Sequence, residues 1–119
     1  MVFGEIIKEV VEKVEGGLAG VIMGVDGIAV DNYIKGGTEL EIQSVGAEYA
    51  VIVEQVKGVS EMLKSGKLKE FITFSEGFIL IIHSINEDYF AALALKPEGN
   101  YGKGRYLLRM AIPKIRAEF

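Results

Sequence analysis

The sequence predicts one α+β domain, in which helices cover both faces of a five-stranded antiparallel sheet. Three observations lead to this prediction. The chain is 119 residues long, which is about the length of a single domain. The spacing of its apolar residues predicts, in order along the chain, a helix, two strands, a helix, three strands and a helix. Every predicted loop is short, as hairpin-linked strands require, and no linker or internal repeat divides residues 1–119.

The first predicted elements are a helix and a β-hairpin. Apolar residues at helical spacing, with charged residues between them, predict a short amphipathic helix that ends at Gly16 and Gly17. The two runs that follow, at 18–24 and 28–34, favour strands. Asp26-Gly27 between them predicts a type I′ turn, because both residue types tolerate positive φ angles.

The longest predicted element is a helix from residue 39 to about residue 64. Thr38 and Glu41 have the spacing of a capping box at its start. One apolar stripe of the helix is predicted to face the core. This stripe comprises Ile42, Val45, Tyr49, Ile52, Val53, Val56, Val59 and Leu63.

A second stripe lies on the opposite side of the same helix, where a helix that covers only its own core needs no apolar residue. Its members are small or apolar, with Glu54 and Gln55 beside them: Ala47, Val51, Gly58 and Met62. Small residues let another backbone come close, and Met adapts to irregular surfaces. We therefore expect a contact face here. The alternative is that Ala47 is simply a good helix former and Gly58 a tolerated defect.

Three strands and a helix complete the predicted fold. Residues 68–74 alternate between apolar and polar, whereas residues 78–85 and 89–95 are apolar at nearly every position. The continuous apolar runs predict strands that are covered on both faces. Asn100 can cap a last helix, in which Pro113 predicts a kink or a stop.

Composition and charge argue against several classes of function. The chain has no Cys and a single His, so we expect no disulfide, no metal site and no cofactor. Its net charge of −4 argues against nucleic-acid binding. No apolar run approaches the roughly 18 residues of a membrane span, and no signal peptide is evident. We expect a cytoplasmic protein.

The sequence offers almost no catalytic machinery, so we expect no enzyme and no catalytic residue. Gly102-x-Gly104 lacks the other glycines and the Lys and Ser/Thr that a phosphate-binding loop has at fixed positions. We therefore interpret these two glycines as allowing close packing at the start of a helix. No carboxylate or hydroxyl near His83 in the sequence forms a recognisable catalytic relay with it. The sequence does not decide whether the fold brings such a group next to it. The three arginines lie on the last helix, where they can pair with acidic residues or contact an acidic partner. A regular helix is a poor position for an arginine finger.

Several segments resemble the Roadblock family of dynein light chains, and within it the bacterial polarity regulators of the MglB type. The resemblance covers residues 17–23, Asp26-Gly27-Ile28, the middle helix, the three closing strands and Asn100-x-Gly102-x-x-Arg105-x-x-Leu108. It implies a middle helix on one face of the sheet and the terminal helices on the other. It also implies a dimer through the middle helix and the third strand, with itself or with a paralogue.

The resemblance assigns roles to particular residues. A dimer or GTPase interface falls on five residues of the middle helix: Ala47, Val51, Glu54, Gly58 and Met62. The dimer edge strand falls on Phe71, Ile72, Thr73 and Phe74, and pairing there would remove an aggregation-prone edge. The implied partner is a Ras-like small GTPase, whose GTP hydrolysis relatives stimulate without an arginine finger. Two alternatives are a structural adaptor that bridges larger assemblies and a small-ligand sensor that uses the apolar sheet as a pocket.

Overall fold

In the computed structural model, which describes residues 2–119, helices and strands follow one another in the predicted order. The elements are α1 (Val2–Lys13), β1 (Gly17–Gly24), β2 (Ala29–Ile34), α2 (Ile42–Met62), β3 (Glu70–Phe74), β4 (Ile79–Ser84), β5 (Tyr89–Leu95) and α3 (Tyr101–Arg116). The α+β class and the element order that the sequence predicts are therefore confirmed.

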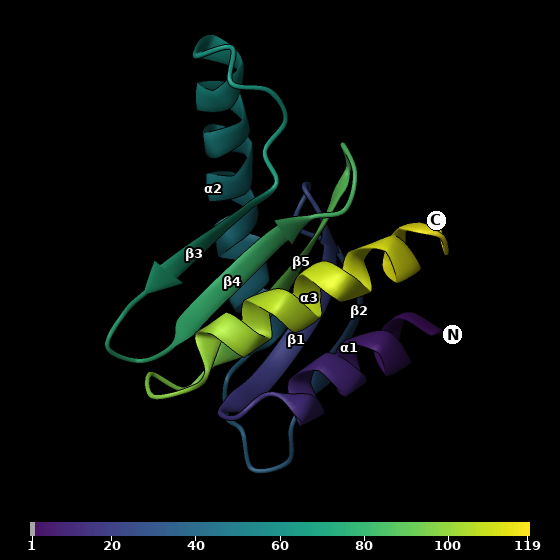
Figure 1. The fold of residues 1–119 in the computed structure, drawn as a ribbon, viewed down its shortest axis with the longest axis vertical. Coiled ribbons are helices and arrows are strands. Elements are labelled where there is room, and N and C mark those ends of the chain that lie inside the picture. The colour runs from purple at the N-terminus through teal and green to yellow at the C-terminus, as the bar shows by residue number, and fades with distance from the viewer. Residues whose placement is uncertain (1) are drawn as a thin grey trace.

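The strands form one antiparallel sheet in the order β2-β1-β5-β4-β3, so β2 and β3 are its edges. Near the middle of the sheet, Ile81 of β4 lies between Ile72 of β3 and Leu93 of β5. One face of the sheet carries α2, and the other carries α1 and α3 (Figure 1). The placement of the helices on the two faces thus matches the one that the family resemblance implies.

A hydrophobic core lies on each face of the sheet. On one face, buried residues of α1 and α3 such as Ile7 and Leu108 pack against Leu93. On the other, Val53 of α2 packs in a cluster with Phe90. Because β4 and β5 supply buried side chains to both cores, the prediction that these strands are covered on both faces is confirmed.

The β1–β2 hairpin differs from its predicted type I′ turn. Gly27 has a positive φ of 87°, whereas Asp26 does not. The Gly27 N–H donates to the Gly24 carbonyl at 2.9 Å, and the strand register shifts between Ile22 and Met23. The connection is therefore longer than a two-residue type I′ turn, and it ends in one Gly with a left-handed backbone conformation. The prediction of a type I′ turn was wrong.

Two helix boundaries also differ from the predictions. The first residue of α2 is Ile42, and Glu41 caps it without a side-chain hydrogen bond, so the predicted capping box is not formed. At α3, Asn100 is the cap as predicted, since its side chain accepts the Lys103 N–H at 3.1 Å. Pro113 does not end α3, because a proline in the last turn removes only one helical hydrogen bond.

Candidate protein-binding surface

The C-terminal half of α2 extends beyond the sheet that its first half covers (Figure 1). Up to Val53 the helix packs on the sheet, with Ile42, Gly46, Ala50 and Val53 buried. Gly46 makes this close packing possible, since a Cβ there would lie 3.0 Å from the end of the Met23 side chain. After Val53, no residue of α2 is buried.

The predicted core stripe of α2 is therefore only partly in the core. Ile42 and Val53 are buried, but Ile52, Val59 and Leu63 are 37%, 53% and 72% exposed. The prediction was wrong for these three residues because periodicity identifies a face of a helix and not the point where the sheet beneath it ends. All three are apolar groups that sequence reasoning missed as candidates for a contact surface.

The residues predicted as an interface on α2 lie mostly on its solvent side. Val51 and Met62 are 60% and 83% exposed, and Glu54 is exposed as well. A Cβ on Gly58 would meet no atom within 4 Å. Ala47 differs, because the β1–β2 turn lies against it and leaves it half-buried.

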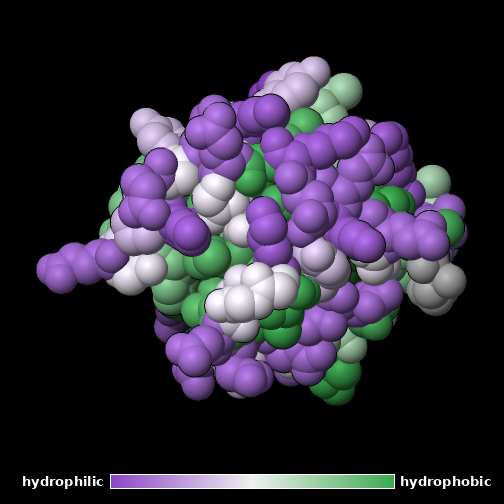
Figure 2. Space-filling view, turned by 90° about the horizontal axis from the view of Figure 1, so that it is seen from below, coloured by the Kyte–Doolittle hydropathy of each residue, from purple (hydrophilic) through white to green (hydrophobic). Residues whose placement is uncertain are grey.

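Together these observations define one apolar surface. We call it the outer face of α2; it consists of Val51, Ile52, Val59 and Met62, together with Leu63, the residue that caps the end of the helix. Such a run of exposed apolar residues, which begins where α2 covers the sheet and continues along the half that projects beyond it, is typical of a protein-binding site. The opposite end of the molecule has a different character, since polar side chains cover most of its surface (Figure 2).

The predicted edge strand lies next to this helix. Among the described strands, β3 pairs with β4 alone, so its other side has no partner. Tyr49 of α2 reaches it, with its hydroxyl 3.2 Å from that of Thr73. Phe71, Ile72 and Thr73 are half-buried, and Phe74 is 61% exposed. The helix and the strand that the resemblance assigns to dimer contacts thus adjoin in one protomer.

An ion pair anchors the start of β3 to α3. Arg105 Nε donates to Glu70 Oε1 at 2.6 Å, and its Nη2 donates to Oε2 at 3.1 Å. The guanidinium hydrogen bonds favour the charged carboxylate, and so they lower the pKa of Glu70 below its ordinary value. The bidentate geometry fixes the orientation of the two side chains, which a Lys could not do.

The other candidate residues have structural roles. A Cβ on Gly104 would lie 3.2 Å from Leu95 and 3.3 Å from Ile81, which confirms the interpretation as close packing at a helix start. His83 Nδ1 lies 2.9 Å from the backbone oxygen of Ser84. Within residues 2–119, no group of three His, Asp or Glu side chains is arranged to hold a metal ion, and no helix is long and apolar enough to cross a membrane.

Comparison with known proteins gives matches among solved structures. No protein-family model and no curated protein matches the chain. MglC from Myxococcus xanthus is 42% identical over 100% of both chains, with a TM-score of 0.74. A Roadblock/LC7 domain from Streptomyces avermitilis is 11% identical, with 98% of this chain and 96% of that chain covered and a TM-score of 0.86. The gliding protein MglB from Thermus thermophilus is 12% identical, with 95% and 84% covered and a TM-score of 0.84. The last two similarities concern the fold, whereas the first extends to the sequence over its full length.

Proposed function

This chain belongs to the Roadblock/LC7 family, and on that premise we propose that it is a homodimeric, non-catalytic regulator or scaffold of a Ras-like small GTPase. Membership of the family supports the broader role of regulator or adaptor. The observation that carries the finer proposal is the outer face of α2, which exposes five large apolar side chains on a helix that needs none of them for its own core.

The dimer is proposed from two adjoining surfaces. The outer face of α2 offers apolar area, and the unpaired side of β3 offers backbone hydrogen-bonding groups. A second copy placed against β3 would extend the sheet across both subunits and cover Phe74. Burial of an edge strand of this kind is a common way for proteins to avoid uncontrolled aggregation.

The way in which the chain would act on a GTPase follows from where its arginines lie. All three belong to α3, on the face of the sheet opposite α2. Arg105 is held by Glu70, and Arg116 donates to the Ile85 carbonyl at 2.8 Å. Arg109 lines a groove on the side of α2 away from its outer face. A GTPase bound across the paired α2 helices of the dimer would therefore receive no arginine from this subunit. The chain would act by favouring a hydrolysis-competent arrangement of the residues of the GTPase itself.

The decisive experiment is single-turnover GTP hydrolysis by the Ras-like GTPase of the source organism, with and without an excess of this protein. We expect faster hydrolysis with the wild-type chain and with Met110→Glu, an exposed substitution on α3. Val51→Glu on the outer face should remove the acceleration. Binding without acceleration would favour the adaptor alternative, and absence of binding would contradict a GTPase partner.

The ligand-sensor alternative finds less support. It needs a pocket on the apolar sheet, but both faces of the sheet hold hydrophobic cores in which β4 and β5 are buried. Small molecules that co-purify with the protein would revive this alternative.

A further inference from the structure

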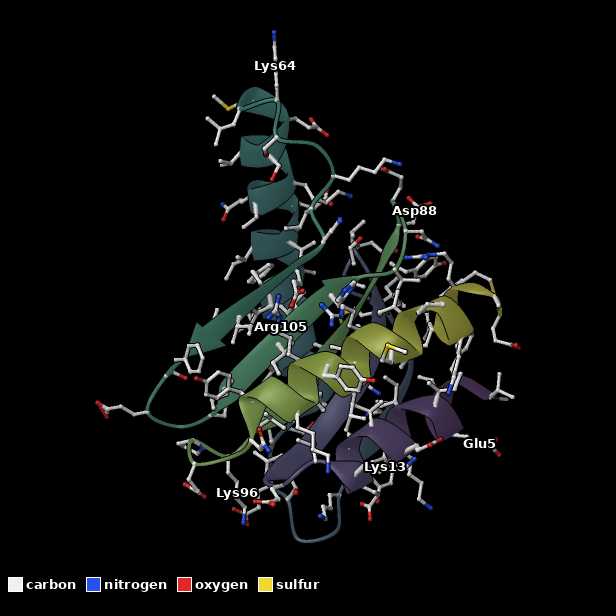
Figure 3. The ribbon with its side chains drawn as sticks, in the orientation of Figure 1. Glu5, Lys13, Lys64, Asp88, Lys96 and Arg105 are labelled. Atoms are coloured by element: carbon white, nitrogen blue, oxygen red, sulfur yellow. The ribbon has the colours of Figure 1, made fainter. Side chains whose placement is uncertain are left out.

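We propose that a groove beneath the projecting half of α2 binds an acidic peptide segment of a partner protein, on a surface separate from the outer face of that helix. The groove has a volume of about 1050 Å³. Its walls come from the end of α2 and the loop that follows, from the β4–β5 turn and from the C-terminal half of α3. In Figure 3, Lys64 marks the tip of α2 and Asp88 marks the β4–β5 turn.

The first observation is a concentration of positive charge. The chain is acidic overall, with a net charge of −4, yet six of its 13 Lys and Arg residues line this groove. They are Lys57, Lys64, Lys67, Lys69, Arg109 and Arg116. Among the described residues, two side-chain carboxylates line it with them, those of Glu61 and Glu87. A cleft lined mainly by one sign of charge concentrates its electric field and attracts ligands of the opposite sign.

The second observation is that half of these cations are not engaged within the protomer. Lys57 lies 3.3 Å from Glu54 Oε1, and Lys67 lies 3.5 Å from Glu87 Oε1. Arg116 donates to a backbone carbonyl. In the described part of the chain, the side chains of Lys64, Lys69 and Arg109 form no ion pair and no hydrogen bond. Their donors are available for carboxylates of another molecule.

The third observation concerns the apolar lining, which distinguishes a peptide from other anions. Leu68 and Pro113 line the groove between the cations and present apolar surface to it, whereas Ile85 and Ile112, at its base, are each only 2% exposed. Acidic side chains would meet the Lys and Arg groups, and apolar side chains between them would cover Leu68 and Pro113. The volume of about 1050 Å³ lies just above the roughly 300–1,000 Å³ that small-molecule pockets occupy, which leaves room for an extended segment. Among the described residues, no Phe, Tyr or Trp lines the groove, and His83 is its only aromatic ring, whereas single-stranded nucleic acids rely on stacking on several aromatic side chains.

The groove and the outer face lie on opposite sides of α2. At 100° per residue, Ser60 and Val51 are about half a turn apart, and Lys57 and Val59 are nearly so. A subunit or GTPase on the outer face would leave the groove side of the helix free. The inference therefore does not depend on the proposed function, and two partners could bind at once.

The test uses labelled synthetic peptides and fluorescence anisotropy. One peptide of about 16 residues combines Glu with interspersed Leu, a second replaces Leu by Ser, and a third replaces Glu by Lys. We expect the Glu/Leu peptide to bind the wild-type chain most tightly and to weaken as salt rises. The double variant Lys69→Glu/Arg109→Glu should bind it about tenfold more weakly, as expected for loss of two exposed charge contacts.

A matched control keeps the same change in net charge. The double variant Lys96→Glu/Lys103→Glu alters two exposed lysines outside the groove, and Lys96 lies at the far end of the molecule (Figure 3). It should bind the Glu/Leu peptide within about twofold of the wild type. An equal loss in both double variants, or no binding to the wild type, would overturn the proposal. So would tighter, groove-dependent binding of phosphatidylglycerol vesicles or of a single-stranded DNA oligomer.

Sedimentation velocity separates this test from that of the proposed function. The groove variant should keep the association state of the wild type, since none of its substitutions lies on the outer face of α2 or in β3. Loss of peptide binding in a chain that keeps this state would locate the effect in the groove. A change in association state on groove substitution would contradict the separation of the two surfaces.

Discussion

At the scale of single residues, the pair formed by Arg105 and Glu70 connects a terminal helix to the first residue of an edge strand. Its contribution to stability depends on the charge of the carboxylate. The pKa of Glu70 is lowered in the folded state, chiefly by the hydrogen bonds from Arg105. The pair therefore stabilises the fold at pH values above the pKa of the unfolded chain, and this contribution is lost as the pH falls through the lower, folded pKa.

We predict that Glu70→Gln lowers the thermal midpoint at pH 7 by a few degrees, the size usual for a partly exposed ion pair. The difference should be smaller at pH 3 than at pH 7, because lowering the pH toward the folded pKa of Glu70 progressively removes the same charge from the wild type. Thermal unfolding followed by circular dichroism at the two pH values measures the difference. Glu98→Gln, in the exposed loop before α3, is the control and should change neither midpoint. A difference in thermal midpoint that is as large at pH 3 as at pH 7 would show that packing, and not the charge, is responsible.

Gly58 permits a second prediction at this scale. A Cβ at this position would meet nothing in the protomer, so Gly58→Ala should stabilise an isolated subunit by about 0.5–1 kcal/mol through helix propensity. The same substitution should weaken a dimer in which a second helix approaches this Gly closely. Denaturant unfolding in a Val51→Glu background measures the first effect, and sedimentation equilibrium in the wild-type background measures the second.

Gly46→Ala is the control for this comparison. Its new Cβ would lie 3.0 Å from Met23 within the protomer, so it should not show the gain expected at position 58. Unchanged dimer affinity in Gly58→Ala would remove this residue from the interface.

At the scale of elements, α2 shows what a sequence pattern can and cannot predict. Helical spacing identified the helix and its two faces, because the side chains of a helix repeat every 3.6 residues whatever lies beneath it. It could not show that the sheet ends near Val53, since that depends on strands far away in sequence. Residues such as Val59 were therefore assigned to the core, although they are exposed.

The outer face of α2 gives the prediction that belongs to this scale. Val51→Glu should convert a dimer into a monomer, because it would bury an unpaired carboxylate in an apolar contact. Light scattering coupled to size exclusion gives the mass directly. Met110→Glu introduces the same charge on α3, at a residue of similar exposure, and should remain dimeric. A dimer that survives Val51→Glu would mean that the subunits pair elsewhere.

At the scale of the whole molecule, the cores were more predictable than the surfaces. Continuous apolar runs in β4 and β5 predicted strands between two layers, and the structure buries both strands. The groove had no comparable signal. Its cations come from residues 57–69 and 109–116, which only the folded chain brings together. The spacing of charged residues within one segment does not reveal such a site.

A dimer would also make the stability of the whole molecule depend on its concentration. We expect the thermal midpoint of the wild type to rise when the protein is concentrated about 100-fold, since mass action favours the associated, folded state. Phe74→Lys on the exposed edge of β3 should remove most of this dependence. Scanning calorimetry at two concentrations provides the comparison. A midpoint independent of concentration in the wild type would indicate that no dimer forms.

The length of α2 that projects beyond the sheet has a further consequence for motion. Residues 54–62 contribute no buried side chain, and their tertiary contacts are few, such as the hydrogen bond of 2.8 Å from Lys57 Nζ to the Glu87 carbonyl. A helix of so few residues is marginal in water when tertiary contacts do not support it. Their amide hydrogens should exchange with solvent through local fraying, well before the global unfolding that exposes residues 42–53. A protein that binds here must also order this segment, so part of the binding free energy is used for folding it. Such a contact forms readily and also releases readily, which suits a surface that exchanges partners.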